Sequence, residues 1–197
     1  MPTIVWDIDN TTRISGHKVT LEGAPQVVPT DQGRALAFDG LDDAVFLDTD
    51  PLEGLSAFTL EALFRPDAGG AAEQRFFHVQ ESGGESRVLL ETRMPNPDRW
   101  YLDTFILSGA ESRALCDAKF VHPAAAWHAV ALVCDGKEMA HYINGERELG
   151  GAIAFKPHGR GRTSIGCRIN KVFWFKGAVR RVRISPRALA AGELMRA

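Results

Sequence analysis

Short segments in the middle of the chain combine apolar residues with side chains that could bind or cleave a sugar. The segment QRFFHVQ contains His78, the segment RVLLETR contains Glu91 and Arg93, and Trp100 follows closely. If these segments are paired strands, such residues could cluster on one sheet face together with Glu61 from an earlier segment, because alternate residues of a strand point the same way. An aromatic ring beside charged groups suits a sugar, whose apolar face stacks on the ring while its hydroxyls form hydrogen bonds. A partly solvated sheet face with ordinary cross-strand ion pairs would carry the same residues.

A second candidate region is the most basic stretch of the chain, KPHGRGRTSIGCRINKVFW at 156–174. Within it, Arg168 and Asn170 could form hydrogen bonds to a ligand, and Trp174 could stack on a sugar ring. The positive charge would suit an acidic glycan, a phosphate or an acidic partner protein. The alternative is a solvated loop, since GRGR lacks the strand–loop–helix context of a phosphate-binding loop.

The same residue types raise the question of catalysis. If the chain is an enzyme that acts on polysaccharides, His78, Glu91 and Arg93 are the catalytic candidates. A retaining glycosidase needs two carboxyl groups about 5 Å apart. No strand offers alternating carboxylates, because Arg93 stands two residues after Glu91. A pair formed by Glu61 and Glu91 from different strands stays open.

Length and composition fit one globular domain that spans residues 1–197. The chain has 23 Lys and Arg against 25 Asp and Glu, a formal net charge of -2, 45% hydrophobic residues and 24% charged residues. Such values are typical of a packed domain rather than a disordered chain. The balanced charge excludes a generally basic nucleic-acid binder, and no apolar run reaches the roughly 18 residues of a membrane-spanning helix. We therefore expect neither a nucleic-acid nor a membrane partner, and the oligomeric state stays open.

The cysteines and the N-terminus favour a cytoplasmic protein. Cys116, Cys134 and Cys167 are odd in number and lack CxxC or His/Cys metal-ligand spacing. Small buried thiols in a reducing compartment are therefore expected, above all for Cys134 and Cys167, which lie in strand-like runs. The beginning, MPTIVWDIDN, has neither the basic nor the apolar region of a signal peptide. A secreted protein whose signal peptide had been removed would show the same beginning.

Alternation of apolar and polar residues, interrupted by turn signals, predicts an all-β antiparallel fold. Tight-turn pairs such as Asp135-Gly136 connect successive hairpins. Only the tail SPRALAAGELM has a helical pattern, with Ser185 as its cap and Pro186 in its first turn. We therefore predict a two-sheet β-sandwich, or jelly roll, with a short C-terminal helix. The predicted strands are 3–8, 34–38, 43–47, 57–65, 74–80, 86–93, 99–107, 127–134, 138–143, 162–168 and 172–184.

Several stretches resemble, in order, the laminin-G-like jelly rolls of the concanavalin A-like lectin/glucanase superfamily. ALAFDGLDDAVFL followed by FTLEALFRP is similar to the opening of that fold, and WHAVALVCDGKEMAHYINGERE to its hairpin with a Trp, a DG turn and an NG turn. TSIGCRINKVFWFKGAVRRVRIS and ALAAGEL are similar to its closing strands and final helix. The resemblance covers roughly residues 34–195 and implies a ligand site on the concave sheet face or at the loop rim. It leaves the function open, because the superfamily includes lectins, adhesion modules, glycoside hydrolases and polysaccharide lyases.

The resemblance also raises the question whether this chain has a calcium site. Many relatives carry an acidic residue of a calcium site in the closing strand, where this chain has Arg180 and Arg181. Arginine cannot ligate calcium, because its nitrogens are donors only and stay protonated. We expect Arg180 either to pair with a carboxylate from the first strands, where the metal would sit, or to point into solvent. Acidic residues such as Asp9 and Asp43 remain, so structural calcium is possible but disfavoured, and no metal or cofactor is expected.

Among the enzymes of the superfamily, the resemblance disfavours a glucanase and leaves a lyase open. The glucanase strand with its E-x-D-x-x-E or E-x-D-x-E carboxylates has no counterpart in this sequence. Alginate-lyase-like jelly rolls use an Arg, a Gln, a His and a Tyr, and His78, Gln80, Arg93 and Tyr101 offer these types. The R-x-E-L-R and Q-I-H patterns of those lyases are absent, however.

The sequence therefore predicts a lectin-like module that recognises an oligo- or polysaccharide on the concave sheet face. One alternative is a polysaccharide lyase or hydrolase that uses the same groove, and another is a protein-interaction module that binds through its rim loops. The predicted ligand-binding residues are Glu61, Trp100, Arg168, Asn170 and Trp174.

Overall fold

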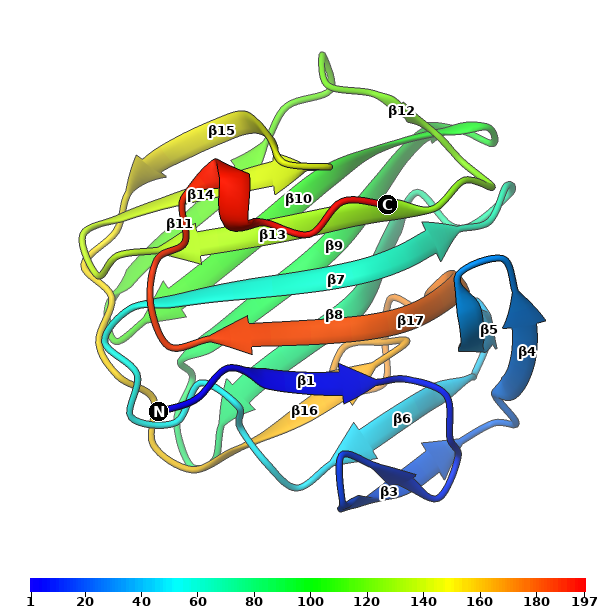
Figure 1. The fold of residues 1–197 in the computed structure, drawn as a ribbon, viewed down its shortest axis with the longest axis horizontal. Helices are drawn as coiled ribbons and strands as arrows, with labels where there is room; N and C mark the ends of the chain where they lie inside the picture. Colours follow the sequence, from blue (N-terminus) through cyan, green and yellow to red (C-terminus); the bar gives the residue numbers. More distant parts are fainter.

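Two antiparallel β-sheets lie face to face in the computed structural model, which describes residues 1–197 (Figure 1). We call the sheet that contains β7 the front sheet and the sheet that contains β9 the back sheet, as they lie in Figure 1. The front sheet consists of β1 (Ile4–Asp7), β4 (Gln26–Thr30), β5 (Gly33–Asp39), β7 (Phe58–Pro66), β13 (His128–Cys134), β14 (Glu138–Ile143), β15 (Glu146–Ala152) and β17 (Lys176–Ser185). The back sheet consists of β2 (Arg13–Ile14), β3 (His17–Glu22), β6 (Ala44–Leu47), β8 (Glu73–Glu81), β9 (Arg87–Asn96), β10 (Arg99–Ser108), β11 (Glu111–Cys116), β12 (His122–Pro123) and β16 (Gly161–Ile165).

The order of the strands confirms the predicted two-sheet antiparallel sandwich. In the front sheet the order is β15-β14-β13-β7-β17-β5-β4, and β1 pairs with β17 beside β5. In the back sheet the order is β11-β10-β9-β8-β16-β6-β3-β2, and β12 pairs with β10. The four neighbouring strands β8 to β11 form one end of the back sheet, and the candidate site lies on them. No helix of the structure has the length and apolar character needed to cross a bilayer.

The strands that the sequence missed are mostly polar strands at or near sheet edges. β2, β4, β11 and β15 are edge strands, and β3 lies next to β2. Most of their residues are exposed or half-buried, so an apolar alternation has no reason to appear in their sequence. The predicted strand 172–184 begins only at Lys176, because Lys171 and Phe173 adopt a φ of 60°, which interrupts an extended strand.

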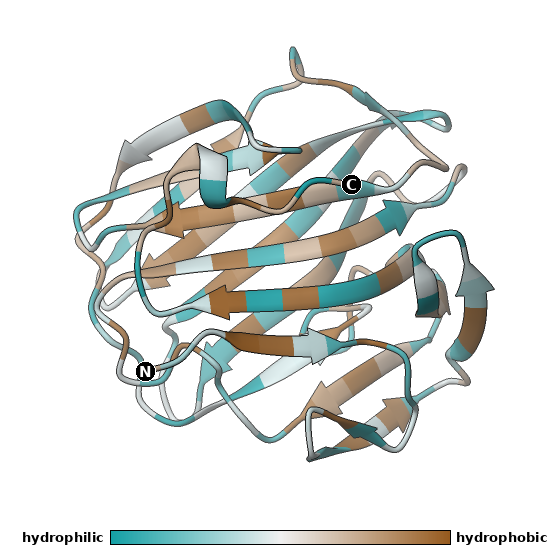
Figure 2. Ribbon diagram, in the orientation of Figure 1, coloured by the Kyte–Doolittle hydropathy of each residue, from teal (hydrophilic) through white to brown (hydrophobic).

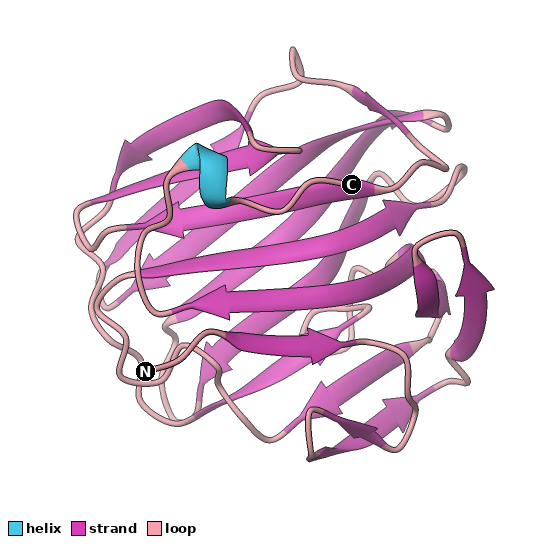
Figure 3. Ribbon diagram, in the orientation of Figure 1, coloured by secondary structure: helices cyan, strands magenta, loops and turns pink.

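The predicted C-terminal helix is present only as one 3-10 turn at Ala191–Glu193 (Figure 3). Ser185 is the last residue of β17 and caps no helix. The segment after β17 instead covers the outer face of the front sheet, where Leu189 and Leu194 pack against Ala131 and Val133 of β13. That face is therefore covered over β7 and β13, as the red segment in Figure 1 shows.

The inner faces of the two sheets meet in a core of 36 buried residues. Phe58, Leu60, Ala62 and Phe64 alternate along β7 and are fully buried, as their period of two predicts. The ring of Phe64 stacks on that of Phe76 from the back sheet, with 4.1 Å between ring centres. Figure 2 shows the corresponding alternation of apolar and polar residues along the strands of the front sheet. Sheet-on-sheet packing therefore decides which residues are left to face outward.

Cysteine placement agrees with the sequence for two residues of three. Cys134 and Cys167 are buried, whereas Cys116 is exposed on the edge strand β11, and all three thiols are free. The expectation of a buried thiol is thus wrong for Cys116, since an edge strand has no layer that covers its outer face.

Trp100 belongs to the core, and this placement generates a stability prediction. The indole is fully buried, its ring meets Phe64 edge to face at 5.1 Å, and its Nε1 donates a hydrogen bond to the carbonyl of Pro123 at 3.2 Å. We expect Trp100→Ala to lower the free energy of unfolding by about 3–5 kcal/mol, because it removes a large buried ring and leaves a cavity. Urea unfolding followed by far-UV circular dichroism measures this loss. A loss below about 1 kcal/mol would show that the indole is not a core residue.

Candidate functional site

A hollow of about 180 Å³ opens on the outer face of the back sheet. It lies over β8, β9, β10 and β11, beside the loop that joins β16 to β17. Four of the residues that line it are arginines and two are carboxylates. The lining residues are Arg75, Arg87, Leu89, Glu91, Arg93, Asp103, Phe105, Ala114 and Arg168.

Strand register brings the lining residues of β9 and β10 together. The two strands pair antiparallel, with Asp103 opposite Glu91 and Phe105 opposite Leu89. Because side chains alternate between the two faces of a sheet, these residues share the outer face. Between them, Leu90 points inward and is part of the core. The hollow is therefore built on paired strands whose inner faces are packed.

β8 supplies Arg75 to the hollow by means of a β-bulge. Arg75 lies opposite Glu91, but the next paired residue is Phe77, opposite Leu90, so that Phe76 is the extra residue. Both phenylalanines are fully buried in the core. A bulge changes the phase of a strand, and here it lets two successive apolar side chains point inward while Arg75 points to the hollow.

Two of the four arginines are neutralised by the carboxylates of the hollow. Arg93 binds Asp103 at 2.7 Å (Nη2 to Oδ2) and lies 3.7 Å from Glu91. Arg75 lies 2.9 Å from Glu91 and 3.1 Å from Glu73, and Glu73 also pairs with Arg93. This network holds the side chains in a fixed arrangement, since each guanidinium contacts at least two carboxylates.

Glu91 is the carboxyl group whose acidity is changed most by this environment. Burial raises its pKa to about 7, and the negative charges of Asp103 and Glu73 add to the rise, whereas Arg75 and Arg93 oppose it. The cost of removing the carboxylate from water therefore exceeds the attraction of the guanidinium groups. Near neutral pH Glu91 can hold or release a proton.

His78 shares the outer face of β8 but does not line the hollow. It is fully buried, and its Nδ1 accepts a hydrogen bond from the backbone N–H of Ile169 at 3.0 Å. Burial lowers the pKa of His78 to about 3, and the charges of Arg168, Arg87 and Arg75 add to this shift. The loop after β16 thus covers a neutral imidazole. The expectation that His78 meets a ligand together with Glu91 and Arg93 is not met in this structure.

Trp100 and Glu61 also lie elsewhere than the sequence analysis placed them. Trp100 faces the core from the inner side of β10, so its ring is no platform for a sugar. Glu61 belongs to the front sheet, where Arg183 donates to it at 2.8 Å and the backbone N–H of Met195 at 2.7 Å. A catalytic pair of Glu61 and Glu91 is therefore excluded, because the two residues stand on different sheets.

The basic stretch contributes one residue to the hollow, which is Arg168. Asn170 is exposed and lies outside the lining. Trp174 is half-buried and packs against Ala44, Phe46 and Cys167, so most of its ring is already in use. The aromatic residue that is exposed in this loop is Phe173, at 38%, and the guanidinium of Arg75 stacks over its ring at 3.7 Å.

Nothing in the sequence indicated Asp103, Arg75, Phe105 or Phe173 as site residues, whereas alternation along RVLLETR already placed Arg87 on the same face as Glu91 and Arg93. Asp103 lies opposite Glu91 only because the register of β9 and β10 shifts between Arg99 and Tyr101, so a plain count back from the turn would not have paired them. Arg75 left no signal either, because the bulge that turns it outward does not show in a plain alternation.

The closing strand contains the predicted arginine–carboxylate pair. Asp7 of β1 accepts hydrogen bonds from Arg180 Nη1 at 2.7 Å and from Arg181 Nε at 2.8 Å. Partial burial raises the pKa of Asp7, but the hydrogen bonds from Arg181 and Arg180 outweigh it and hold the pKa below its ordinary value. The pair joins β1 to β17, and the alternative in which Arg180 points freely into solvent is excluded.

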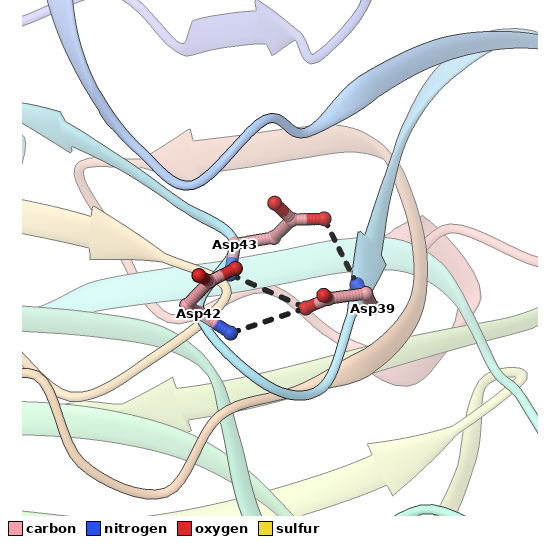
Figure 4. Close-up of side chains that lie close together, drawn as sticks. All are labelled: Asp39, Asp42 and Asp43. Carbon is pink, nitrogen blue, oxygen red and sulfur yellow. Dashed lines mark hydrogen bonds between the residues drawn. The ribbon is translucent and has the colours of Figure 1, made fainter.

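A cluster of three carboxylates lies in the turn between β5 and β6 (Figure 4). The ligand atoms of Asp39, Asp42 and Asp43 lie within 4.8 Å of one another. The oxygens of Asp39 and Asp43 already accept backbone hydrogen bonds: Asp39 Oδ1 from Leu41, Asp42 and Asp43, and the Asp43 carboxylate from Asp39 and Ala24. The arrangement is that of a turn held by aspartates, so the donor set does not require a cation to explain it.

Comparison with known proteins places the fold. The family model described as the concanavalin A-like lectin/glucanases superfamily (Laminin_G_3) matches residues 38–195. A search of curated proteins gave no match.

Solved structures with the same fold include three proteins of different kinds. Domain 4 of AbnA, a GH43 extracellular arabinanase from Geobacillus stearothermophilus, in complex with arabinotriose, is 16% identical and has a TM-score of 0.74 over 96% of this chain and 94% of that chain. The binding domain of botulinum neurotoxin serotype G is 12% identical, with a TM-score of 0.66 over 96% of this chain and 48% of that one. The NanB sialidase from Streptococcus pneumoniae is 14% identical, with a TM-score of 0.62 over 81% of this chain and 26% of that one. At these identities the likeness shows a shared fold.

The raised pKa of Glu91 predicts that this residue destabilises the fold as the pH rises. A carboxylate whose pKa is lowered by folding has the opposite effect. The folded protein holds this proton more tightly than the unfolded chain, so the stability that it contributes is present at low pH and is lost as the pH rises through about 7. Relative to Glu91→Gln, the wild type should therefore lose a few kcal/mol, or several degrees in Tm, between about pH 5 and pH 8. Thermal melts at matched ionic strength measure the difference.

Glu85→Gln is the control for this experiment, since Glu85 precedes the same strand and its side chain is 81% exposed. Its melts should run parallel to those of the wild type. A difference between wild type and Glu91→Gln that stays constant across the pH range would contradict the raised pKa.

The contacts of Arg180 generate a prediction about calcium. We propose that the guanidinium stands where relatives place a metal, so that millimolar calcium or EDTA leaves the Tm of the wild type unchanged. Asp7→Asn should lower stability by up to about 1 kcal/mol, because it removes a pair that is partly screened by solvent. A calcium-dependent rise in Tm that Asp43→Asn abolishes would sink this proposal and assign a site to the turn between β5 and β6.

Proposed function

The chain belongs to the concanavalin A-like lectin/glucanases superfamily, and from this premise we propose that it is a carbohydrate-binding module whose ligand is an oligo- or polysaccharide. The proposed binding site is the hollow over β8, β9, β10 and β11 on the outer face of the back sheet. The front sheet is a poorer candidate, because the C-terminal segment covers part of its outer face.

The observation that carries this proposal is the combination, in one hollow, of an aromatic face with fixed polar groups. Phe105 lines the hollow beside the ion network of Arg93 and Asp103. Phe173 is exposed in the loop beside the hollow, and the guanidinium of Arg75, from β8, stacks over its ring. A sugar can stack its apolar face on a ring and place its hydroxyls against charged donors and acceptors. Because the polar groups already bind one another, little reorganisation is needed when a ligand arrives.

The solved structures support the same class of ligand by analogy of fold. AbnA domain 4 was determined with arabinotriose, and its length matches that of this chain closely. A shared fold carries no residue-level correspondence at 16% identity. The ligand of this chain is therefore proposed from its own hollow.

One observation favours a second function, cleavage of a polysaccharide. Glu91, with a pKa near 7, lies opposite Asp103 on the neighbouring strand, and both contact Arg93. Two neighbouring carboxyl groups, one of which has a pKa raised toward neutrality, are the kind of acid and base pair that glycosidases use. Asp103 is thus the second carboxyl group beside Glu91, a role for which Glu61 was the candidate from the sequence. Binding is proposed as the primary function, because both carboxylates are held by arginines and His78 is covered.

One experiment distinguishes binding from cleavage. The protein is incubated with a panel of neutral and acidic polysaccharides that includes arabinan, and both retention of the polymer and release of product are followed over time. The wild type should retain at least one polymer in affinity electrophoresis, while reducing ends and the absorbance of unsaturated uronate stay at background. Phe105→Leu should weaken that retention about tenfold, because it keeps apolar volume but removes the flat ring face. Phe120→Leu is the matched control, since Phe120 is half-buried under Lys119 in a loop outside the hollow.

The outcomes exclude one another. Product that disappears in Glu91→Gln would make the protein an enzyme. Equal retention by Phe105→Leu and Phe120→Leu would move the glycan away from the hollow. If no polymer is retained and no product forms, the carbohydrate proposal is wrong and a protein partner at the rim loops takes its place.

A further inference from the structure

Two arginines of the hollow, Arg87 and Arg168, have no carboxylate partner inside it. We propose that they form a subsite for an oxyanion, so that the ligand of the hollow is an acidic glycan that presents a carboxylate or a sulfate to this pair. This inference rests on the proposed carbohydrate function and adds the chemical class of the ligand.

Arg168 is a cation without a partner on a rigidly held turn. Its side chain is in no ion pair and no hydrogen bond, although it lines the hollow and is half-buried. Its backbone is fixed on three sides: its N–H donates to Val172 O at 3.0 Å, its carbonyl accepts from Lys171 N at 2.8 Å, and Ile169 N–H donates to His78. The turn therefore fixes the point from which the side chain reaches the hollow, and the chain itself supplies no partner for the guanidinium.

Arg87 reaches the hollow from β9 with most of its donors free. Its side chain is 17% exposed, and its guanidinium lies 5.2 Å from the centre of the Phe105 ring. Only Nη1 is used, toward the carbonyl of Glu85 at 3.0 Å and the Glu85 carboxylate at 3.4 Å. That carboxylate is 81% exposed and does not line the hollow. Nε and Nη2 form a fork that matches the two oxygens of a carboxylate or sulfate.

The electrostatic environment agrees with this geometry. Four arginines and two carboxylates line the hollow, and Arg168 is the one of the four arginines that contacts no carboxylate. Burial lowers the pKa of Arg87 and the charge of Arg168 lowers it further, whereas the charges of Glu85 and Glu91 oppose the shift. Arg87 and Arg168 also contribute to the lowered pKa of His78. Like charges close together repel, and an oxyanion between Arg87 and Arg168 would relieve that repulsion.

A neutral glycan would not exploit this arrangement. Its hydroxyls could accept from the two guanidinium groups, but such hydrogen bonds would leave Arg168 without a counter-charge. An anionic group gains charge-assisted bonds, which are roughly twice as strong as neutral ones. The carboxylate of a uronate and the sulfate ester of a sulfated glycan offer the same chemistry, and the experiment separates them.

The test uses two matched pairs of polymers. In the first pair, polygalacturonate is charged and its methyl ester is neutral, because esterification replaces each carboxylate by a methyl ester. In the second pair, dextran sulfate and dextran differ in sulfation. We expect the wild type to bind at least one charged polymer at least about tenfold more tightly than its neutral form, as measured by affinity electrophoresis at fixed ionic strength. Arg168→Gln and Arg87→Gln should each remove most of this preference. Retention of polygalacturonate alone would identify a uronate, and retention of dextran sulfate alone a sulfate ester.

Arg34→Gln is the control variant, because it removes the same charge from an exposed position on β5 of the front sheet. It should retain the full preference for the charged polymer. If Arg34→Gln weakens binding as much as Arg168→Gln, the attraction is diffuse and no subsite exists. If neutral polymers bind in the hollow as tightly as charged ones, the oxyanion subsite is wrong while the carbohydrate function stands. If neither charged nor neutral polymers of the wider panel bind, the carbohydrate function fails first.

Discussion

The contact between the inner faces of the two sheets is the constraint on which the rest of the structure depends. Phe64 and Phe76 stack across it, and 36 buried hydrophobic residues form the core between the sheets. Because each strand has only two faces, filling the inner one decides which residues face outward. The bulge in β8 follows from the same constraint: Phe76 and Phe77 both enter the core, and the change of phase turns Arg75 toward the outer face. The hollow is thus a consequence of how the core is packed.

The sequence predicts the fold well because the core strands alternate visibly, and it predicts the site only where that alternation holds. Glu91 and Arg93 share the expected face of β9. Trp100 does not share that face, and the sequence of its strand explains why. Trp100, Leu102 and Ile106 form one apolar face of β10, and an apolar face packs against the core. Long-range pairings leave weaker signals. The approach of Arg168 to β9 depends on a loop whose course is set by positive φ values at Lys171 and Phe173.

Arginine–carboxylate contacts recur on the outer faces of both sheets, with different consequences. On the front sheet, Asp7 is held by Arg180 and Arg181 and ties β1 to β17, where exposure to solvent screens the attraction. On the back sheet, Glu91 is almost fully buried, so the same kind of contact competes with a large desolvation cost. The raised pKa of Glu91 shows that desolvation prevails there. Arginine–carboxylate contacts therefore hold β1 to β17 in the front sheet, whereas in the back sheet they leave Glu91 with a pKa near neutrality.

The charge left over in the hollow is the feature that packing does not explain. A buried or half-buried cation without a partner is a cost that a fold tolerates only where water can still reach it or where something else supplies the counter-charge. Arg93 and Arg75 meet carboxylates of the chain, whereas Arg168 meets none, although its turn is fixed by backbone hydrogen bonds. Moving Arg168 into solvent would remove this cost, yet the hydrogen bond from Ile169 to His78 holds the turn against the sheet. The structure thus keeps an unpaired cation in the hollow that Phe105 also lines, where a ligand that combines a stacking surface with negative charge would supply the counter-charge.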